Sequence, residues 1–152
     1  MNGRILELIS KIHLDWKRQV ARNLAPHGIG PKQIFLLRRL EETGGLAPSA
    51  IATLLHADRP SVTSMLGTLE RAGWISRQKD PSDGKRGIVS LSEAGRKKLA
   101  SVPEVLWRSG RTRFDPEACL DREDRAELER LLGKLHAWIS EGSGTAPTDG
   151  PR

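Results

Sequence analysis

The sequence contains little of what disulfide-bonded, secreted or membrane-spanning proteins depend on. Its 152 residues include one cysteine, no tyrosine and only 4% aromatic residues. Because Cys119 has no partner for an internal disulfide, the chain suits the reducing cytoplasm. No apolar run approaches the roughly 18 residues that a membrane span needs. The first residues, MNGRILELISKIHLDWKRQ, also lack the continuous apolar segment of a secretion signal. We therefore expect no membrane association.

Signatures of catalysis and of metal binding are missing as well. The sequence has no glycine-rich phosphate loop and no nucleophile elbow. Its four histidines do not have the spacing of metal ligands; they are His13, His27, His56 and His136. We therefore expect that the protein is not an enzyme and that it binds neither a metal ion nor a cofactor.

Positive charge is concentrated in the middle of the chain. The formal net charge is +6, and residues 59–98 contain nine Lys and Arg against four Asp and Glu. A basic block in a cytoplasmic protein favours a polyanionic partner, most often nucleic acid. The alternative is a solvated surface that Lys and Arg keep soluble.

The order of the expected elements is typical of a winged helix-turn-helix. Apolar residues at steps of three and four predict helices over residues 4–24, 31–43, about 48–55, 59–72, from 93 and from 121. The stretches WISRQK and GIVSLS alternate apolar and polar residues, and the turn formers between them predict a β-hairpin. The fold class is therefore mainly α with a small β-hairpin wing (α+β). Residues 31–100 form the winged lobe, and the Gly-, Ser- and Pro-rich residues 141–152 are expected to be disordered.

The fourth predicted helix has an exposed face suited to DNA. Its apolar side chains lie on one side, and the other side bears small hydroxyls and arginines, which approach base edges closely. Recognition helices enter the major groove with their N-terminal end. The expected base-reading residues are Arg59, Ser61, Thr63, Ser64 and Thr68. Ser49, at the start of the third helix, is either a phosphate contact or a simple cap, and a polar face without a partner is the alternative for the fourth helix.

The stretch DPSDGKRG, from Asp80 to Gly87, is expected at the tip of the hairpin. It does not fit a calcium loop, because Leu91 occupies the position where such a loop needs a bidentate Glu. A basic tip instead suits a minor groove or the phosphates. The expected contacts come from Arg77, Lys79, Lys85 and Arg86.

The stretch ADRPSVTSMLGTLERAGWISRQKDPSDGKRGIVSLSEAG resembles the MarR (multiple antibiotic resistance regulator) family of winged-helix transcription regulators. The resemblance covers about residues 4–139. Family wings place Arg two residues after the second Asp of the wing motif, where this chain has Lys85 followed by Arg86. Which of the two enters the minor groove stays open.

The resemblance implies a homodimer on a palindromic double-stranded operator. Residues 4–24 and 104–140 would form its helical dimerisation region, and the function would be repression, relieved by a small-molecule effector such as an aromatic acid. The residues expected near that effector are His13, Trp16 and Lys17. Three alternatives stay open: a winged-helix module that binds proteins without DNA, a redox regulator that uses Cys119, and activation at some promoters.

Overall fold

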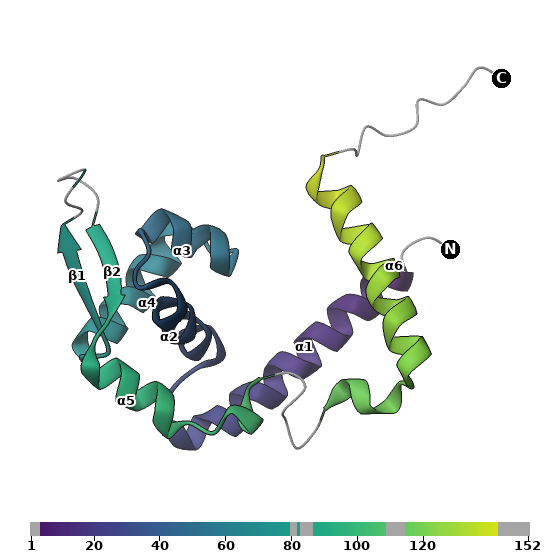
Figure 1. The fold of residues 1–152 in the computed structure, drawn as a ribbon, viewed down its shortest axis with the longest axis horizontal. Coiled ribbons are helices and arrows are strands. Elements are labelled where there is room, and N and C mark those ends of the chain that lie inside the picture. The colour runs from purple at the N-terminus through teal and green to yellow at the C-terminus, as the bar shows by residue number, and fades with distance from the viewer. Residues whose placement is uncertain (1–3, 80–81, 83–86, 109–114, 143–152) are drawn as a thin grey trace. The chain divides into compact units, whose positions relative to one another are not determined.

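The computed structural model describes residues 4–79, 82, 87–108 and 115–142. The chain divides into two compact units, residues 1–113 and 114–152, which are described separately. Figure 1 shows helices accompanied by one antiparallel hairpin in the first unit. The predicted fold class, mainly α with a β-hairpin wing, is confirmed.

The helices of the first unit begin and end at residues whose chemistry explains their position. They are α1 (Arg4–Leu24), α2 (Pro31–Thr43), α3 (Pro48–Leu55), α4 (Arg59–Arg71) and α5 (Glu93–Ser101). Proline occupies the start of α2 and of α3, where its missing N–H costs no helical hydrogen bond. The side chain of Ser92 accepts a hydrogen bond from the Gly95 N–H at 2.9 Å and so caps α5. A short 3₁₀ turn over Glu104–Leu106 follows α5.

The wing consists of β1 (Ile75–Lys79) and β2 (Gly87–Leu91), paired antiparallel with Ile75 opposite Leu91. A third segment, which the sequence did not indicate, joins this hairpin through one residue. Leu46 and Val89 exchange two backbone hydrogen bonds of 2.9 and 2.8 Å. Neighbouring Gly45 lies so close to the wing that a Cβ there would approach Ile88 Cγ2 to 2.7 Å. The wing is therefore fixed to the segment that links α2 and α3.

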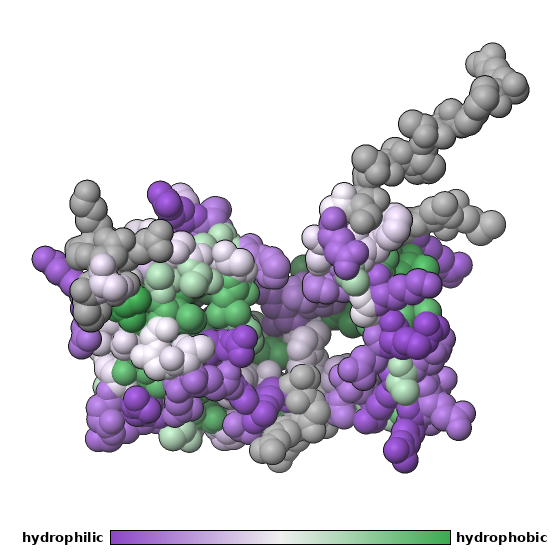
Figure 2. All heavy atoms as spheres, turned by 45° about the horizontal axis from the view of Figure 1, so that its top comes forward, coloured by the Kyte–Doolittle hydropathy of each residue, from purple (hydrophilic) through white to green (hydrophobic). Residues whose placement is uncertain are grey.

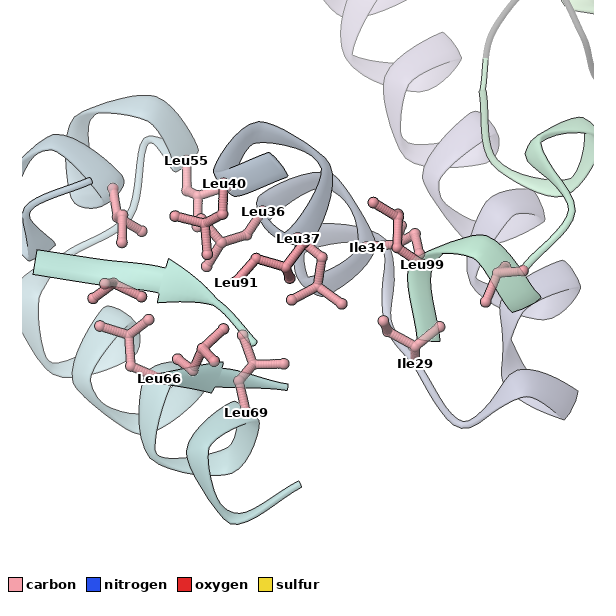
Figure 3. Close-up of a cluster of buried hydrophobic side chains, with 14 of the residues drawn as sticks. Ile29, Ile34, Leu36, Leu37, Leu40, Leu55, Leu66, Leu69, Leu91 and Leu99 are labelled. Atoms are coloured by element: carbon pink, nitrogen blue, oxygen red, sulfur yellow. The ribbon is translucent and has the colours of Figure 1, made fainter. Parts of the chain in front are cut away.

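The core of the first unit lies between the helices and the wing. Figure 3 shows leucines of α2 facing side chains of α4 and β2. The apolar stripes that the sequence predicted on α2, α3 and α4 supply about half of this core; the fully buried members include Ile34, Leu37, Leu40, Ile51, Leu66 and Leu69. Val20 and Leu24 bring the C-terminal end of α1 into the same core. The winged lobe thus closes its own hydrophobic core within one chain.

The N-terminal half of α1 leaves apolar side chains in solvent. The exposed fractions are 67% for Ile5, 57% for Leu8 and 56% for Ile12. Hydrophobic residues at the surface are green among hydrophilic ones in Figure 2. Contiguous exposed apolar surface on a globular chain usually marks an interaction site.

The second unit consists of a short 3₁₀ turn, Pro116–Cys119, and α6 (Arg122–Ser140). The side chain of Asp121 caps α6 by accepting hydrogen bonds from the N–H groups of Glu123 and Asp124, at 2.8 and 2.9 Å. No residue of α6 is buried. The apolar face that the sequence predicted is present but uncovered; its exposed members are Leu128, Leu131, Leu132, Trp138 and Ile139.

Candidate functional site

Helix α4 presents a polar face opposite its buried one. Val62, Leu66 and Leu69 point into the core, and this fixes the direction of the remaining side chains. All five residues predicted to read bases are exposed, namely Arg59, Ser61, Thr63, Ser64 and Thr68. Near the C-terminal end, Arg71 donates a hydrogen bond to the hydroxyl of Thr68 at 3.3 Å. This arrangement leaves the N-terminal half of the face open to a partner.

Asp58 fixes where α4 begins. Its carboxylate accepts a hydrogen bond from the backbone N–H of Ser61 at 2.7 Å. Hydrogen bonds from Ser61 lower the pKa of Asp58 below its ordinary value of 3.8, and the charge of Lys32 lowers it further. Since the pKa is depressed in the folded state, this cap stabilises α4 above pH 3.8 and is lost as the pH falls through the folded value.

The predicted phosphate contacts on the wing occupy different environments. Arg77, on β1, forms an ion pair with Glu70 of α4, with 2.9 Å between Nε and Oε1. Lys79 is exposed at the end of β1. Lys85 and Arg86 lie outside the described residues. Ser49 is exposed in the first turn of α3, and its carbonyl oxygen accepts a hydrogen bond from the Thr53 hydroxyl.

A cavity of about 500 Å³ lies between α1, α2 and α3. It brings together the three residues predicted to meet an effector, His13, Trp16 and Lys17. The sequence analysis missed its other polar and aromatic members, which are Lys32, Phe35, His56 and Trp107. These come from separate parts of the chain, so only the fold shows that they share one cavity.

The charges around this cavity favour an anion. Among the residues that the structure describes, two lysines and two histidines line it and no Asp or Glu does, while Val20, Ile34 and Leu54 contribute apolar surface. The indole N–H of Trp107 is buried and has no acceptor among the described residues. A second cavity, of about 350 Å³, also touches Trp107 but is lined by Glu41, Glu42 and Glu104. The larger cavity is therefore the better match for a ligand with acceptor oxygens and an apolar body.

Other kinds of site find little support in the part of the chain that the structure describes. There, no three His, Cys, Asp or Glu side chains lie close enough to hold a metal ion. Across the same residues, no helix has the length and apolar character needed to cross a membrane. Cys119 is exposed, and its thiol donates a hydrogen bond to the Pro116 carbonyl.

Comparison with known proteins agrees with the geometry. The family model of the MarR family matches residues 29–86. The HTH-type transcriptional regulator FarR of Neisseria gonorrhoeae is 32% identical over 108 residues, which are 70% of this chain and 71% of FarR.

Two solved structures extend the likeness to most of the chain. The transcriptional repressor CouR, bound to a 23-mer DNA duplex, is 28% identical with a TM-score of 0.72, over 90% of this chain and 92% of CouR. NadR, in complex with 4-hydroxyphenylacetate, is 30% identical with a TM-score of 0.65, over 86% of this chain and 89% of NadR.

Proposed function

The chain belongs to the MarR family of DNA-binding transcription regulators, and on that premise we propose that it is a homodimeric repressor released from its operator by a small anionic ligand. The observation that carries the proposal is the exposed polar face of α4, placed beside a basic hairpin. Catalysis and cofactors have no part in it. The setting is the cytoplasm, with the protein on the nucleoid when bound to DNA.

In this proposal α4 enters the major groove with its first two turns. Arg59 is placed to donate two hydrogen bonds to a guanine, and the hydroxyls of Ser61, Thr63, Ser64 and Thr68 approach base edges and phosphates. Their common exposure opposite a buried face supports this role.

Contacts to the DNA backbone come from residues on either side of α4. Ser49 and Lys79 bind phosphates, as does Arg77, which Glu70 holds at the base of the wing. Lys85 and Arg86 at the wing tip contact the minor groove, where either side chain adds positive charge in a narrow, negative site.

The uncovered apolar faces of α1 and α6 supply the dimer interface. Residues 4–24 and 104–140 form the dimerisation region and residues 31–100 the DNA-binding lobe, whereas residues 143–152 of the predicted tail lie outside the described residues. Burying the exposed Ile, Leu and Trp side chains against a second copy of the chain removes them from water, which is the main driving force of association. The two winged lobes of the dimer then bind a palindromic operator whose half-sites lie about 34–36 Å apart.

The ligand is a carboxylate with an aromatic or apolar body, and it binds in the cavity of about 500 Å³ between α1, α2 and α3. Lys17, Lys32, His13 and His56 offer positive charge or hydrogen bonds to the carboxylate. The structure of NadR with 4-hydroxyphenylacetate supports this class of ligand.

Selection of bound DNA from a random duplex pool tests the proposal directly. We expect enrichment of an inverted repeat whose half-sites are centred about one helical turn apart. A pool that stays random after several rounds, with protein that remains folded and dimeric, would contradict sequence-specific binding.

A further inference from the structure

His56 lies at the point where the cavity meets the helix-turn-helix. It follows the last residue of α3 and lines the cavity together with Leu54 and Leu55. Two residues later, Asp58 caps the recognition helix α4. No other residue that lines the cavity belongs to the turn between α3 and α4.

The backbone of His56 adopts a conformation that residues with a Cβ rarely accept. Its φ is 48° and its ψ is 42°, and among the described residues no other non-glycine has a positive φ. Its N–H donates to the carbonyls of Ala52 and Thr53, which closes the C-terminus of α3. A left-handed residue commonly ends a helix, but the position usually belongs to glycine, and this backbone is less favourable for a residue with a Cβ even though histidine accepts it more readily than most.

Electrostatic interaction extends from the cavity to the same helix start. Lys32 lines the cavity, and its charge contributes to the lowered pKa of Asp58. An anion that binds beside Lys32 would offset that charge at the cap of α4. The cavity therefore reaches the first turn of α4 both through the backbone at His56 and through the charge of Lys32.

We propose that His56 couples occupancy of the cavity to the position of the recognition helix. The proposal rests on the proposed function, because it takes an anionic effector to be the occupant. A carboxylate that binds the imidazole draws His56 out of its left-handed conformation, and the turn then displaces the first turn of α4. The ligand shifts the equilibrium because its contact with the imidazole differs between the two states of the turn.

Replacement of His56 by glycine, compared with His13→Ala, tests the coupling. Each substitution removes one imidazole from the cavity, but only His56 belongs to the turn. Glycine adopts positive φ freely, so H56G keeps the native backbone without strain. His56→Asn is the second variant, because asparagine also accepts the left-handed region and lacks the imidazole.

The probes are benzoate and 4-hydroxyphenylacetate, and two readouts separate binding from coupling. Trp16 and Trp107 line the cavity, so tryptophan fluorescence reports probe binding without DNA. Fluorescence anisotropy of a labelled operator duplex, with and without saturating probe, then gives the coupling as a ratio of affinities.

We expect saturating probe to weaken operator binding by the wild type and by H13A about tenfold, within the usual range of allosteric coupling. H56G and H56N should bind the probe in the fluorescence assay, yet their operator affinity should change less than about twofold on saturation. If saturating probe still weakened operator binding tenfold in both variants, the coupling through His56 would be wrong, while the proposed ligand response would stand. Should the wild type respond to neither probe in either assay, the proposed ligand response would fail, and the role of His56 with it.

Discussion

Similar apolar stripes are buried in the winged lobe and exposed in the two terminal helices. In the lobe, the apolar stripes of α2 and α4 are buried, with Leu37 and Leu69 fully removed from solvent. In α6 the stripe is equally regular, yet Trp138 is 60% exposed and no residue of the helix is buried. The N-terminal half of α1 resembles α6 in this respect, since Ile5 is 67% exposed.

The lobe thus closes a complete core within its own unit, whereas the N-terminal half of α1 and the whole of α6 each expose their apolar side chains. An amphipathic helix gains most of its stability from packing its apolar face, so α1 and α6 need surface from elsewhere. In the proposed homodimer, a second copy of the chain would provide that surface and would also supply the second lobe that a palindromic operator requires.

The largest effect is expected when the uncovered face of α6 receives charge. Leu131→Glu combined with Trp138→Glu should give a monomer, because two carboxylates would be buried at the interface. Operator affinity should then fall by about 100-fold or more, since the two half-sites are no longer bound together. Analytical ultracentrifugation and anisotropy measure the two outcomes.

Ala126→Glu is the control, because it adds one Glu at an exposed position of α6 away from the apolar stripe. It should leave both the dimer and operator binding intact. A double variant that stays dimeric would show that α6 is not part of the interface.

Shortening a side chain in the core of the lobe should lower the free energy of unfolding and leave the dimer intact. Leu66 is 1% exposed, so Leu66→Ala should lower the free energy of unfolding by about 2–5 kcal/mol. Urea denaturation followed by circular dichroism checks this value. The dimer should persist in sedimentation at low denaturant; its loss would mean that the two regions do not fold as separate units.

Removal of the basic wing tip should weaken operator binding and leave the dimer unchanged. We expect Lys85→Ala with Arg86→Ala to reduce operator affinity about 10- to 100-fold, and the salt slope should shrink by up to about 2 as two positive charges in the minor groove are lost. Lys97→Ala, on the exposed side of α5, serves as the charge control. Unaltered operator affinity in the double variant would mean that the wing does not touch DNA.

Much of the fold could be predicted from the sequence because its signals are local. Apolar residues at steps of three and four located α2, α3 and α4, and both strands of the wing were found within one residue. The bridge between Leu46 and Val89 could not be predicted, because it depends on how α2 packs against the wing.

Part of the candidate site could likewise be predicted from the sequence, and part could not. The exposed face of α4 follows from helical periodicity alone, whereas the cavity joins α1, α2 and α3 with Trp107. Neither Lys32 nor His56 has a sequence signal that connects it with His13. The unusual backbone of His56 is a property of the turn in three dimensions and is not encoded by a glycine, the usual signal for positive φ.

A single-residue comparison concerns the two ends of α4. Arg59→Ala should weaken binding to the selected operator by about 1–3 kcal/mol and relax the base preference at one position. Arg71→Ala should have less effect, because its side chain lies at the C-terminal end of α4 and donates to Thr68. Competition with single-base operator variants measures both. Equal losses for the two variants would contradict entry of α4 by its N-terminal end.

The most direct test of the central claim is the affinity of the intact dimer for its selected operator, measured by anisotropy as the salt concentration rises. We predict that log affinity falls linearly with log salt, with a slope of about −0.9 for each phosphate neutralised, and that a scrambled duplex binds at least about 10³-fold more weakly. A flat response to salt, or equal affinity for operator and scrambled duplex, would contradict the account.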